Sequence, residues 1–214
     1  VSGFSTGSVT DMRNMFYGCS GLTSLDVSGF STGSVTNMSS MFNNCSGLTS
    51  LDVSGFDTEK VTNMSDMFAV CRNLTNLNIS GINTKNVTSM REMFASCSNL
   101  TNIDVSGFDT SKVTDMYQMF SNCSKIASLD LSGFSTVSVT NMSRMFALCY
   151  KLTTIYTSSS FNITNVTNSS SMFYDCRILV GGSGTTYNAS NANDATFAHI
   201  DGGTSNPGYF TAKP

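Results

Sequence analysis

Hydrophobic and polar positions along this chain follow one pattern that returns every 26 residues. The stretch VTNMSSMFNNCSGLTSLDVSGF at 35–56 reappears at 61–82 as VTNMSDMFAVCRNLTNLNISGI. A fixed period between about 20 and 50 residues predicts a solenoid, in which each unit buries its apolar face against its neighbours. One cysteine marks each unit, and successive cysteines are 26 residues apart except for the last interval of 27: Cys19, Cys45, Cys71, Cys97, Cys123, Cys149 and Cys176.

Each unit contains two different spacings of apolar residues. The segment MSSMFNNC at 38–45 places them at i, i+3, i+4 and i+7, which is typical of the buried face of a helix. The segment LTSLDVS at 48–54 alternates apolar and polar residues, which predicts a strand with one buried side. Gly55 and its equivalents follow the strand, where we expect a turn with a positive φ. We therefore predict an α/β repeat of about seven coils, with a parallel sheet on one face and short helices on the other.

The periodic pattern divides the chain into two regions. We expect residues 1–180 to form the array, with a truncated first repeat in which Val1 takes the position of Val27, as in a piece of a longer protein. The last repeat has one extra residue and places Thr157 where an apolar residue should point inward. We expect residues 181–214 to cap the C-terminal end of the array through apolar side chains: Tyr187, Phe197, Ile200, Tyr209 and Phe210.

The chain is poor in charged residues. They make up 12% of the 214 residues, about half of the usual share, whereas 40% apolar content is enough for a core. The net charge of −3 comes without a basic cluster, so we expect no nucleic-acid partner and no binding to an anionic membrane surface. No apolar run approaches the roughly 18 residues of a membrane span.

The recurring cysteine is interpreted as a small apolar residue of the core. A chain of disulfides and a metal site are the alternatives. Stacked cysteines would be close enough for disulfides, but parallel side chains do not offer the required dihedral of about 90°, and an odd number leaves one thiol free. The chain has no CxxC motif and one histidine, which disfavours zinc. We expect seven reduced, buried thiols.

Candidates for catalysis or cofactor binding are few. His199 lies close to Asp201 in TFAHIDGG, but no GxSxG motif supplies a nucleophilic serine, so we interpret it as a surface residue. The glycine-rich VGGSGTT at 180–186 lacks the lysine of a phosphate-binding loop. The segment NASNAND at 188–194 lacks the spacing and the closing glutamate of a calcium loop. We expect no catalytic residues, no metal and no cofactor.

A row of polar residues is the main candidate for a binding site. Aspartate recurs at one outward position of the predicted strands, with Asn78 replacing one aspartate and Tyr156 ending the row. One interpretation is that neighbouring Ser and Thr hydroxyls and water solvate this column. The other is a row of acceptors for the basic groups of a partner, or for calcium, although Asn78 argues against a metal. The predicted ligand-binding residues are Ser24, Asp26, Ser50, Asp52, Asn76, Asn78, Asn102, Asp104, Ser128 and Asp130.

Aromatic residues on the predicted helical side offer a second possible contact. They are Tyr17, Tyr117, Tyr150 and Tyr174. A strip of small polar residues without aromatics is a poor surface for binding hot spots, which favours a passive stalk over an adhesion module.

The unit LTSLDVSGFDTEKVTNMSDMFAVC at 48–71 resembles the 26-residue repeat of the BspA-type leucine-rich-repeat surface proteins of bacteria. The resemblance covers about 180 residues and implies a leucine-rich-repeat solenoid of an extracellular protein that is attached to the cell envelope. It also implies a non-catalytic adhesion or ligand-binding module, whose partner is an extracellular protein or glycan, such as a host matrix protein. The family defines no catalytic residues. A stalk or spacer that presents another domain is the alternative function.

Overall fold

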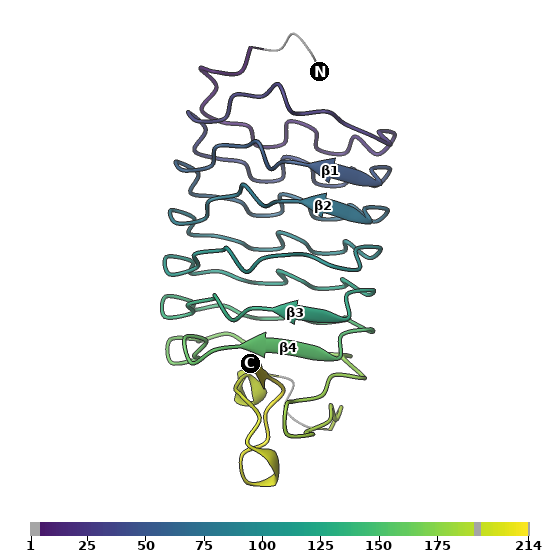
Figure 1. The fold of residues 1–214 in the computed structure, drawn as a ribbon, viewed down its shortest axis with the longest axis vertical. Helices are drawn as coiled ribbons and strands as arrows, with labels where there is room; N and C mark the ends of the chain where they lie inside the picture. The colour runs from purple at the N-terminus through teal and green to yellow at the C-terminus, as the bar shows by residue number, and fades with distance from the viewer. Residues whose placement is uncertain (1–4, 191–193, 214) are drawn as a thin grey trace.

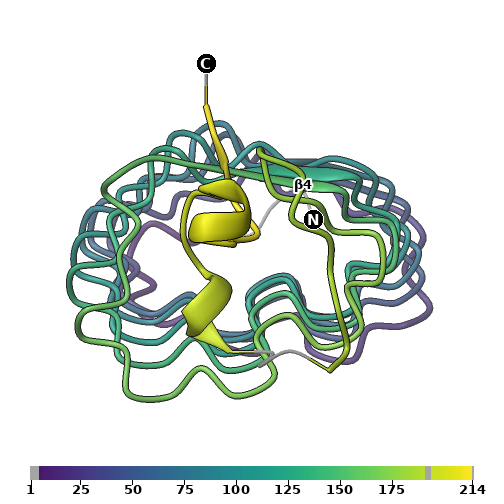
Figure 2. The same cartoon turned by 90° about the horizontal axis from the view of Figure 1, so that it is seen from below.

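The computed structural model describes residues 5–190 and 194–213, which form coils stacked along the long axis of the molecule (Figure 1). Seen along that axis, successive coils superpose around a common interior (Figure 2). We call the side that carries the strands the sheet wall. We call residues 37–45 and their equivalents in the other coils the turn wall. Val1 lies outside the described residues.

The sheet wall of the described chain contains two short parallel sheets. β1 pairs with β2, while β3, β4 and β5 follow one another in the second sheet. The paired residues of β1 and β2, and of β3 and β4, are 26 positions apart, so the pairing register equals the sequence period. Residues 102–104 form no strand, so the single sheet that the sequence predicts is interrupted there. The strands are β1 (Ser50–Asp52), β2 (Asn76–Asn78), β3 (Ser128–Asp130), β4 (Thr154–Thr157) and β5 (Thr211–Ala212).

The prediction of short helices is wrong, because the described residues contain no α-helix. The segments expected to be helical form the turn wall instead. The backbone N–H groups of Met38 and Phe42 donate to carbonyl oxygens in the next coil, those of Asn63 and Met67, at 3.0 and 2.9 Å. Parallel β-bridges join the start of the wall from coil to coil, at Asp11, Asn37, Asn63, Ser89, Asp115, Asn141 and Asn168.

Left-handed residues explain why this wall is not helical. Ser40 and Asn44 have φ angles of 55° and 58°, and the other coils have left-handed residues at the same two positions. A right-handed helix cannot continue through such a residue. The apolar spacing of 38–45 therefore comes from two consecutive turns that direct their apolar side chains into the core. Asn, Asp and Gly adopt this conformation most readily, and they occupy several of the positions: Asn14, Gly18, Asn44, Asp66, Asn122 and Asp175.

Columns of identical side chains fill the interior between the walls. Phe42, Phe68 and Phe94 stack in succession, with ring centroids 5.7 and 5.8 Å apart and interplanar angles of 3° and 4°. Methionines and cysteines of the turn wall and leucines of the sheet wall are buried beside them. Burial of these side chains is the main source of stability in a repeat with so few charges.

A buried threonine at the same position of six repeats connects neighbouring coils. The Thr58 hydroxyl donates to the backbone oxygen of Asn83 at 2.9 Å and accepts from its backbone N–H at 2.7 Å. Thr110 makes the same pair of bonds to Ser135, at 2.8 and 2.9 Å. A hydroxyl can donate and accept at once, so it satisfies two backbone groups that would otherwise be buried without partners. This threonine was not among the residues predicted to be structurally or functionally important.

Gly81 is required for close packing and not for a left-handed turn. Its φ is not positive, and neither is that of Gly55, contrary to the prediction for this position. A Cβ atom at Gly81 would lie 1.8 Å from the backbone oxygen of Ser54 in the previous coil. Glycine therefore lets two coils approach each other where the strand ends.

Six cysteines are buried, whereas Cys19 in the first described coil is partly exposed, so the prediction of seven buried thiols is wrong at that position. The Cys71 thiol donates to the carbonyl oxygen of Phe42 in the previous coil at 3.1 Å, and the other buried cysteines repeat this bond. Burial raises the pKa of Cys97 and Cys149 to about 12. These thiols stay protonated at neutral pH and act as core residues that also donate a hydrogen bond.

The C-terminal residues lie against the last coil (Figures 1 and 2). Phe210 packs edge-on against Phe161 with ring centroids 4.9 Å apart, and Tyr209 packs against Phe173 at 5.2 Å. The Tyr209 and Phe210 side chains are fully buried, and β5 extends the sheet beside β4. Two single-turn 3₁₀ helices lie in this part of the chain, η1 (Ala195–Phe197) and η2 (Gly203–Ser205).

Candidate functional site

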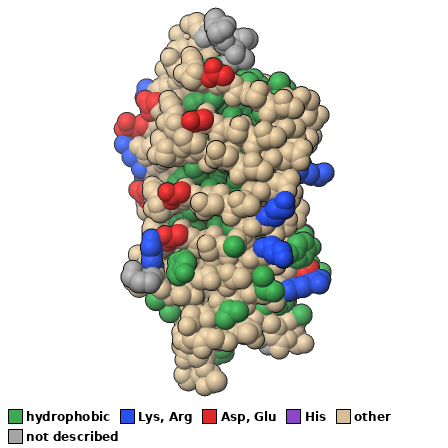
Figure 3. All heavy atoms as spheres, turned by 45° about the vertical axis from the view of Figure 1, so that its right-hand side comes forward, with side chains coloured by type: hydrophobic (Ala, Val, Ile, Leu, Met, Phe, Trp, Pro, Cys, Tyr) green, Lys and Arg blue, Asp and Glu red, His purple; other side chains and the backbone are tan. Residues whose placement is uncertain are grey.

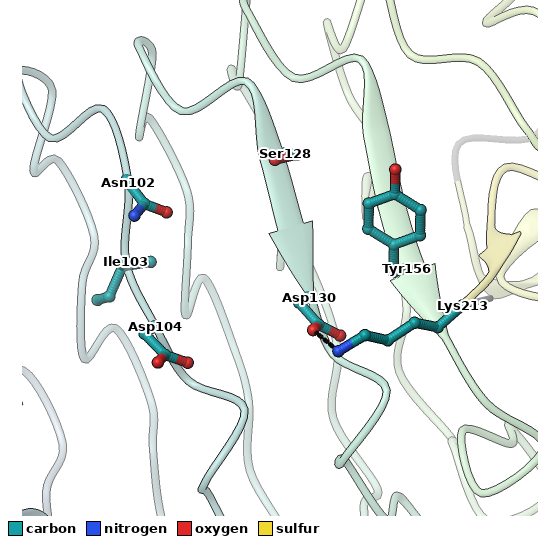
Figure 4. Close-up of a pocket in the computed structure, with 7 residues that line it drawn as sticks. All are labelled: Asn102, Ile103, Asp104, Ser128, Asp130, Tyr156 and Lys213. Carbon is teal, nitrogen blue, oxygen red and sulfur yellow. Dashed lines mark hydrogen bonds and ion pairs between the residues drawn. The ribbon is translucent and has the colours of Figure 1, made fainter. Parts of the chain in front are cut away.

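All ten residues of the predicted binding face line two hollows on the sheet wall. The N-terminal hollow, of 470 Å³, is lined by Leu25 and Leu51 and by six of the predicted residues: Ser24, Asp26, Ser50, Asp52, Asn76 and Asn78. The C-terminal hollow, of 340 Å³, is lined by Asn102, Ile103, Asp104, Ser128, Asp130, Tyr156 and Lys213 (Figure 4). We call these two hollows together the polar strip. Figure 3 shows acidic side chains following one another along this face.

Each aspartate of the column caps the turn that ends its own strand. The Oδ1 atom of Asp52 accepts from the backbone N–H of Ser54 at 2.9 Å. Asp104 accepts from both the backbone N–H and the hydroxyl of Ser106, at 3.0 and 2.7 Å. Asn78 makes the same backbone contact to Ser80 at 3.3 Å, so an amide can replace the carboxylate in this turn. The column therefore has a structural role in these turns.

The column is negatively charged at neutral pH. Hydrogen bonds from the hydroxyl and the backbone N–H of Ser54 hold the pKa of Asp52 below its usual range. Ser106 lowers the pKa of Asp104 in the same way. A carboxylate that accepts hydrogen bonds from its own backbone keeps further lone pairs for a ligand.

The C-terminal hollow differs from the N-terminal one by an aromatic ring and a cation. Tyr156 occupies the column position on β4, and Lys213, just beyond β5, extends along the strand ends (Figure 4). The Nζ atom of Lys213 donates to the Asp130 carboxylate. Burial alone would raise the pKa of Asp130, but the bonds from Lys213 and Ser132 keep it lowered. Asp130 is the one column carboxylate with an ion pair in the described part of the chain.

Lys213 was not predicted as a residue of this site. It lies 83 positions after Asp130 and outside the repeat, so no periodic signal relates the two. Tyr156 was predicted to end the acidic row but not to be part of the binding face. Its place in the repeat was a sufficient signal, because it continues the register of Asp130 on the neighbouring strand.

The tyrosines outside the strip are not equivalent. Tyr17, Tyr150 and Tyr174 are exposed. Tyr117 is partly buried, and the Arg91 guanidinium lies 4.0 Å from the centroid of its ring. Tyr117 is thus already engaged in a cation–π contact.

Asp201 and the glycine-rich loop at 180–186 form a structural unit. The Asp201 carboxylate accepts from the backbone N–H groups of Ser183 and Thr185, at 2.8 and 2.9 Å, and from the Thr185 hydroxyl at 2.7 Å. Burial opposes ionisation, but hydrogen bonds from Thr185, Gly203 and Gly208 hold the pKa of Asp201 well below its usual range. The loop therefore binds a carboxylate of its own chain.

The remaining candidates give no reactive arrangement. The partly buried His199 ring contacts the backbone oxygen of Ile200 at 2.9 Å, while Asp201 is committed to the glycine-rich loop. Across residues 5–190 and 194–213, no group of three or more His, Cys, Asp or Glu side chains could hold a metal ion. Three of the seven residues of the calcium-loop candidate at 188–194, residues 191–193, lie outside the described residues.

No helix in the described chain is long and apolar enough to cross a membrane.

Comparisons with known proteins support the repeat architecture. Searches of curated proteins and of solved structures each found no match. One family model matches twice, over residues 1–102 and 88–201, which together cover most of the chain. The chain therefore belongs to the family described as Mycoplasma protein of unknown function, DUF285.

Proposed function

We propose that the protein is a non-catalytic adhesion module that binds an extracellular macromolecule along the polar strip. The observation that carries this proposal is that all ten predicted residues line two adjoining hollows on one face. The resemblance to BspA-type leucine-rich-repeat proteins supports the adhesive role and an extracellular, envelope-attached location. Membership of DUF285 agrees with the repeat and specifies no activity.

The strip favours many weak polar contacts over a few strong ones. Its surface consists mainly of Ser, Asp and Asn, and the described residues contribute one aromatic ring to it, that of Tyr156. Such a surface lacks the buried aromatic and arginine residues that usually dominate binding energy. Affinity of one copy is therefore modest, and several copies on one cell increase it through multivalency.

The charge of the strip selects a basic partner. Asp26, Asp52 and Asp104 have lowered pKa values and make no ion pair within the described residues. Lys213 on Asp130 illustrates how a lysine reaches this column. Complementary charges mainly accelerate encounter and impose partner choice, so binding should weaken as salt increases.

The test replaces two carboxylates without disturbing the turns. In the double variant Asp52→Asn and Asp104→Asn, the amide oxygens can still cap the strand ends, as Asn78 does. We expect weaker binding to a matrix-protein panel in surface plasmon resonance, with a reduced salt dependence and an unchanged melting temperature. The double change to Lys should abolish binding.

Asp109→Asn is the matched control. Asp109 also caps a turn, through the backbone N–H of Ser111 at 3.0 Å, but it does not line the strip. Binding that persists in the strip variants would exclude the strip as the contact.

A passive stalk is the alternative function. The specific observation in its favour is that each column aspartate already serves its own turn. If no matrix protein or glycan binds to the wild-type protein, the stalk is the better explanation.

A further inference from the structure

A third hollow lies on the turn wall, away from the polar strip. It has a volume of 230 Å³ and spans neighbouring coils. Leu148 contributes apolar surface, Tyr174 contributes an aromatic ring, and Arg144 contributes a cation. Leu148 and Tyr174 are adjacent across the coil boundary, because the Leu148 N–H donates to the Tyr174 carbonyl oxygen at 2.7 Å.

Leu148 adopts a conformation that its side chain disfavours. Its φ is 65°, in the left-handed region. The same position in other coils is occupied by Asn44 and Asn122, which tolerate that region, and by Val70, which shares the disfavoured conformation. Strain at this position therefore does not by itself mark a site, and Leu148 is distinguished by lining a hollow. The apolar side chain is thus placed at the surface where an asparagine would fold with less strain.

The surroundings of the hollow are both aromatic and basic. Tyr174 and the neighbouring Tyr150 are 53% and 41% exposed. Arg144 lines the hollow, is exposed and makes no ion pair with any other described residue, whereas Asp175, which follows Tyr174 in the chain, is paired with Arg177. Figure 3 shows Lys and Arg side chains beside hydrophobic ones on a flank separate from the acidic column. Tyrosine and arginine are among the residues that are enriched at binding hot spots.

We propose that this hollow is a second binding site, for an acidic segment of a partner protein that carries one apolar or aromatic side chain. The apolar side chain enters between Leu148 and Tyr174, and a neighbouring carboxylate faces Arg144. Charge complementarity selects the acidic segment. The apolar floor distinguishes it from an anionic polysaccharide, which would pair with Arg144 and leave Leu148 and Tyr174 without a contact. The proposal is independent of the function proposed for the polar strip.

The experiment uses the full chain and a fluorescein-labelled synthetic peptide with one Phe between Asp and Glu residues. Two control peptides carry Ser in place of Phe, or Asn and Gln in place of the acids. Fluorescence anisotropy should show binding of the first peptide alone. We expect Leu148→Asn and Arg144→Glu each to weaken it about tenfold, the loss typical of truncating one hot-spot contact.

Two controls keep the result interpretable. Leu148→Asn reproduces the residue of the equivalent positions in other coils, so its melting temperature should equal or exceed that of the wild type. Lys60→Glu makes the same change in net charge as Arg144→Glu, on an exposed residue several coils away, and should leave peptide binding unchanged.

The proposal fails if the wild type does not bind the acidic Phe peptide, or if Leu148→Asn binds it as tightly. Equal binding of the Ser peptide would also overturn it, because charge alone would then explain the contact. Dextran sulfate provides the last arm. The hollow would be a polyanion site and not a peptide site if dextran sulfate displaces the peptide and if its affinity falls in Arg144→Glu but not in Leu148→Asn.

Discussion

Backbone hydrogen bonds join neighbouring coils in both the sheet wall and the turn wall, but only in the turn wall do they continue without interruption. Four backbone hydrogen bonds join the turn wall across each of the six coil boundaries from residues 12–18 to residues 168–174. The sheet wall loses its pairing at 102–104, between β2 and β3. The wall with the more regular strand-like sequence thus has the less continuous hydrogen bonding. Regular backbone pairing between coils depends on the neighbouring coil and does not require an extended strand.

The largest expected difference between the walls is in their response to alkaline pH. Unfolded thiols ionise from about pH 8.5, whereas burial raises the pKa of Cys45 to about 11 and of Cys97 and Cys149 to about 12. Between these pH values the unfolded state binds fewer protons than the folded state. The free energy of unfolding is therefore highest below about pH 8.5 and falls as the pH rises, by about 1.4 kcal/mol per pH unit for each buried thiol.

Urea denaturation between pH 8 and 10.5 would measure this slope. The double variant Cys97→Ala and Cys149→Ala should reduce it by about 2.7 kcal/mol per pH unit. A stability that stays constant over this range would show that the turn-wall thiols are accessible in the folded state.

A cavity in the turn wall should cost more than a cavity in the sheet wall. Phe94 is fully buried and stacks on Phe68 and Phe120 at 5.8 and 5.6 Å, so Phe94→Ala should destabilise the protein by about 3–5 kcal/mol. Ile103 lies in the interrupted part of the sheet wall and lines the C-terminal hollow, so Ile103→Ala should cost about 2 kcal/mol. Equal losses in urea denaturation would mean that the two walls are equally well packed there.

A stabilising change is expected at the end of the sheet wall. Thr157 is 1% exposed, and its hydroxyl has no hydrogen-bond partner in the described residues. Thr157→Val matches the size of the side chain and removes the unpaired group, which should raise the free energy of unfolding by about 1–2 kcal/mol. Thr157→Ser keeps the hydroxyl and should not stabilise. A loss of stability in the valine variant would indicate an unrecognised partner for the hydroxyl.

A smaller gain in the free energy of unfolding is expected in the turn wall, where an unfavourable backbone conformation, and not an unpaired polar group, lowers the stability. Val70 has a φ of 62°, a conformation that β-branched residues disfavour. Val70→Asn introduces the residue found at positions 44 and 122 and should stabilise by about 1 kcal/mol. Thermal unfolding by circular dichroism measures the change. Asn44→Val is the reciprocal variant and should lower the melting temperature.

The smallest expected effect is the acid response of the sheet wall. Asp26, Asp52 and Asp104 have lowered pKa values because serines two residues later donate to them. Their contribution is present above the unfolded pKa of about 3.9 and is lost as the pH falls below it. The loss should be slight because these carboxylates face water. Asp52→Asn should flatten the profile between pH 5 and pH 2, and an unchanged profile would show that the cap contributes nothing to stability.

The sequence correctly placed the apolar residues in the core and the polar strip on one surface. Both follow from the 26-residue period, because stacking identical units brings Leu51 beside Leu77 and Ser50 beside Asn76. A register shift would expose the leucines, so burial alone fixes this alignment. The period does not specify the backbone conformation of the turn wall. Apolar residues at i, i+3, i+4 and i+7 fit one face of a helix and also fit two successive turns with left-handed residues.

The tertiary structure decided between these two conformations. A helical N–H finds its acceptor four residues back in the same segment, whereas the N–H of Phe42 finds Met67 in the next coil. The Met67 carbonyl oxygen is available only after the coils have stacked, so the local sequence around Phe42 does not predict this hydrogen bond. The asparagines, aspartates and glycine at the left-handed positions were the one local signal. Lys213 reaches Asp130 across 83 residues for the same reason: folding, and not spacing, brings the two together.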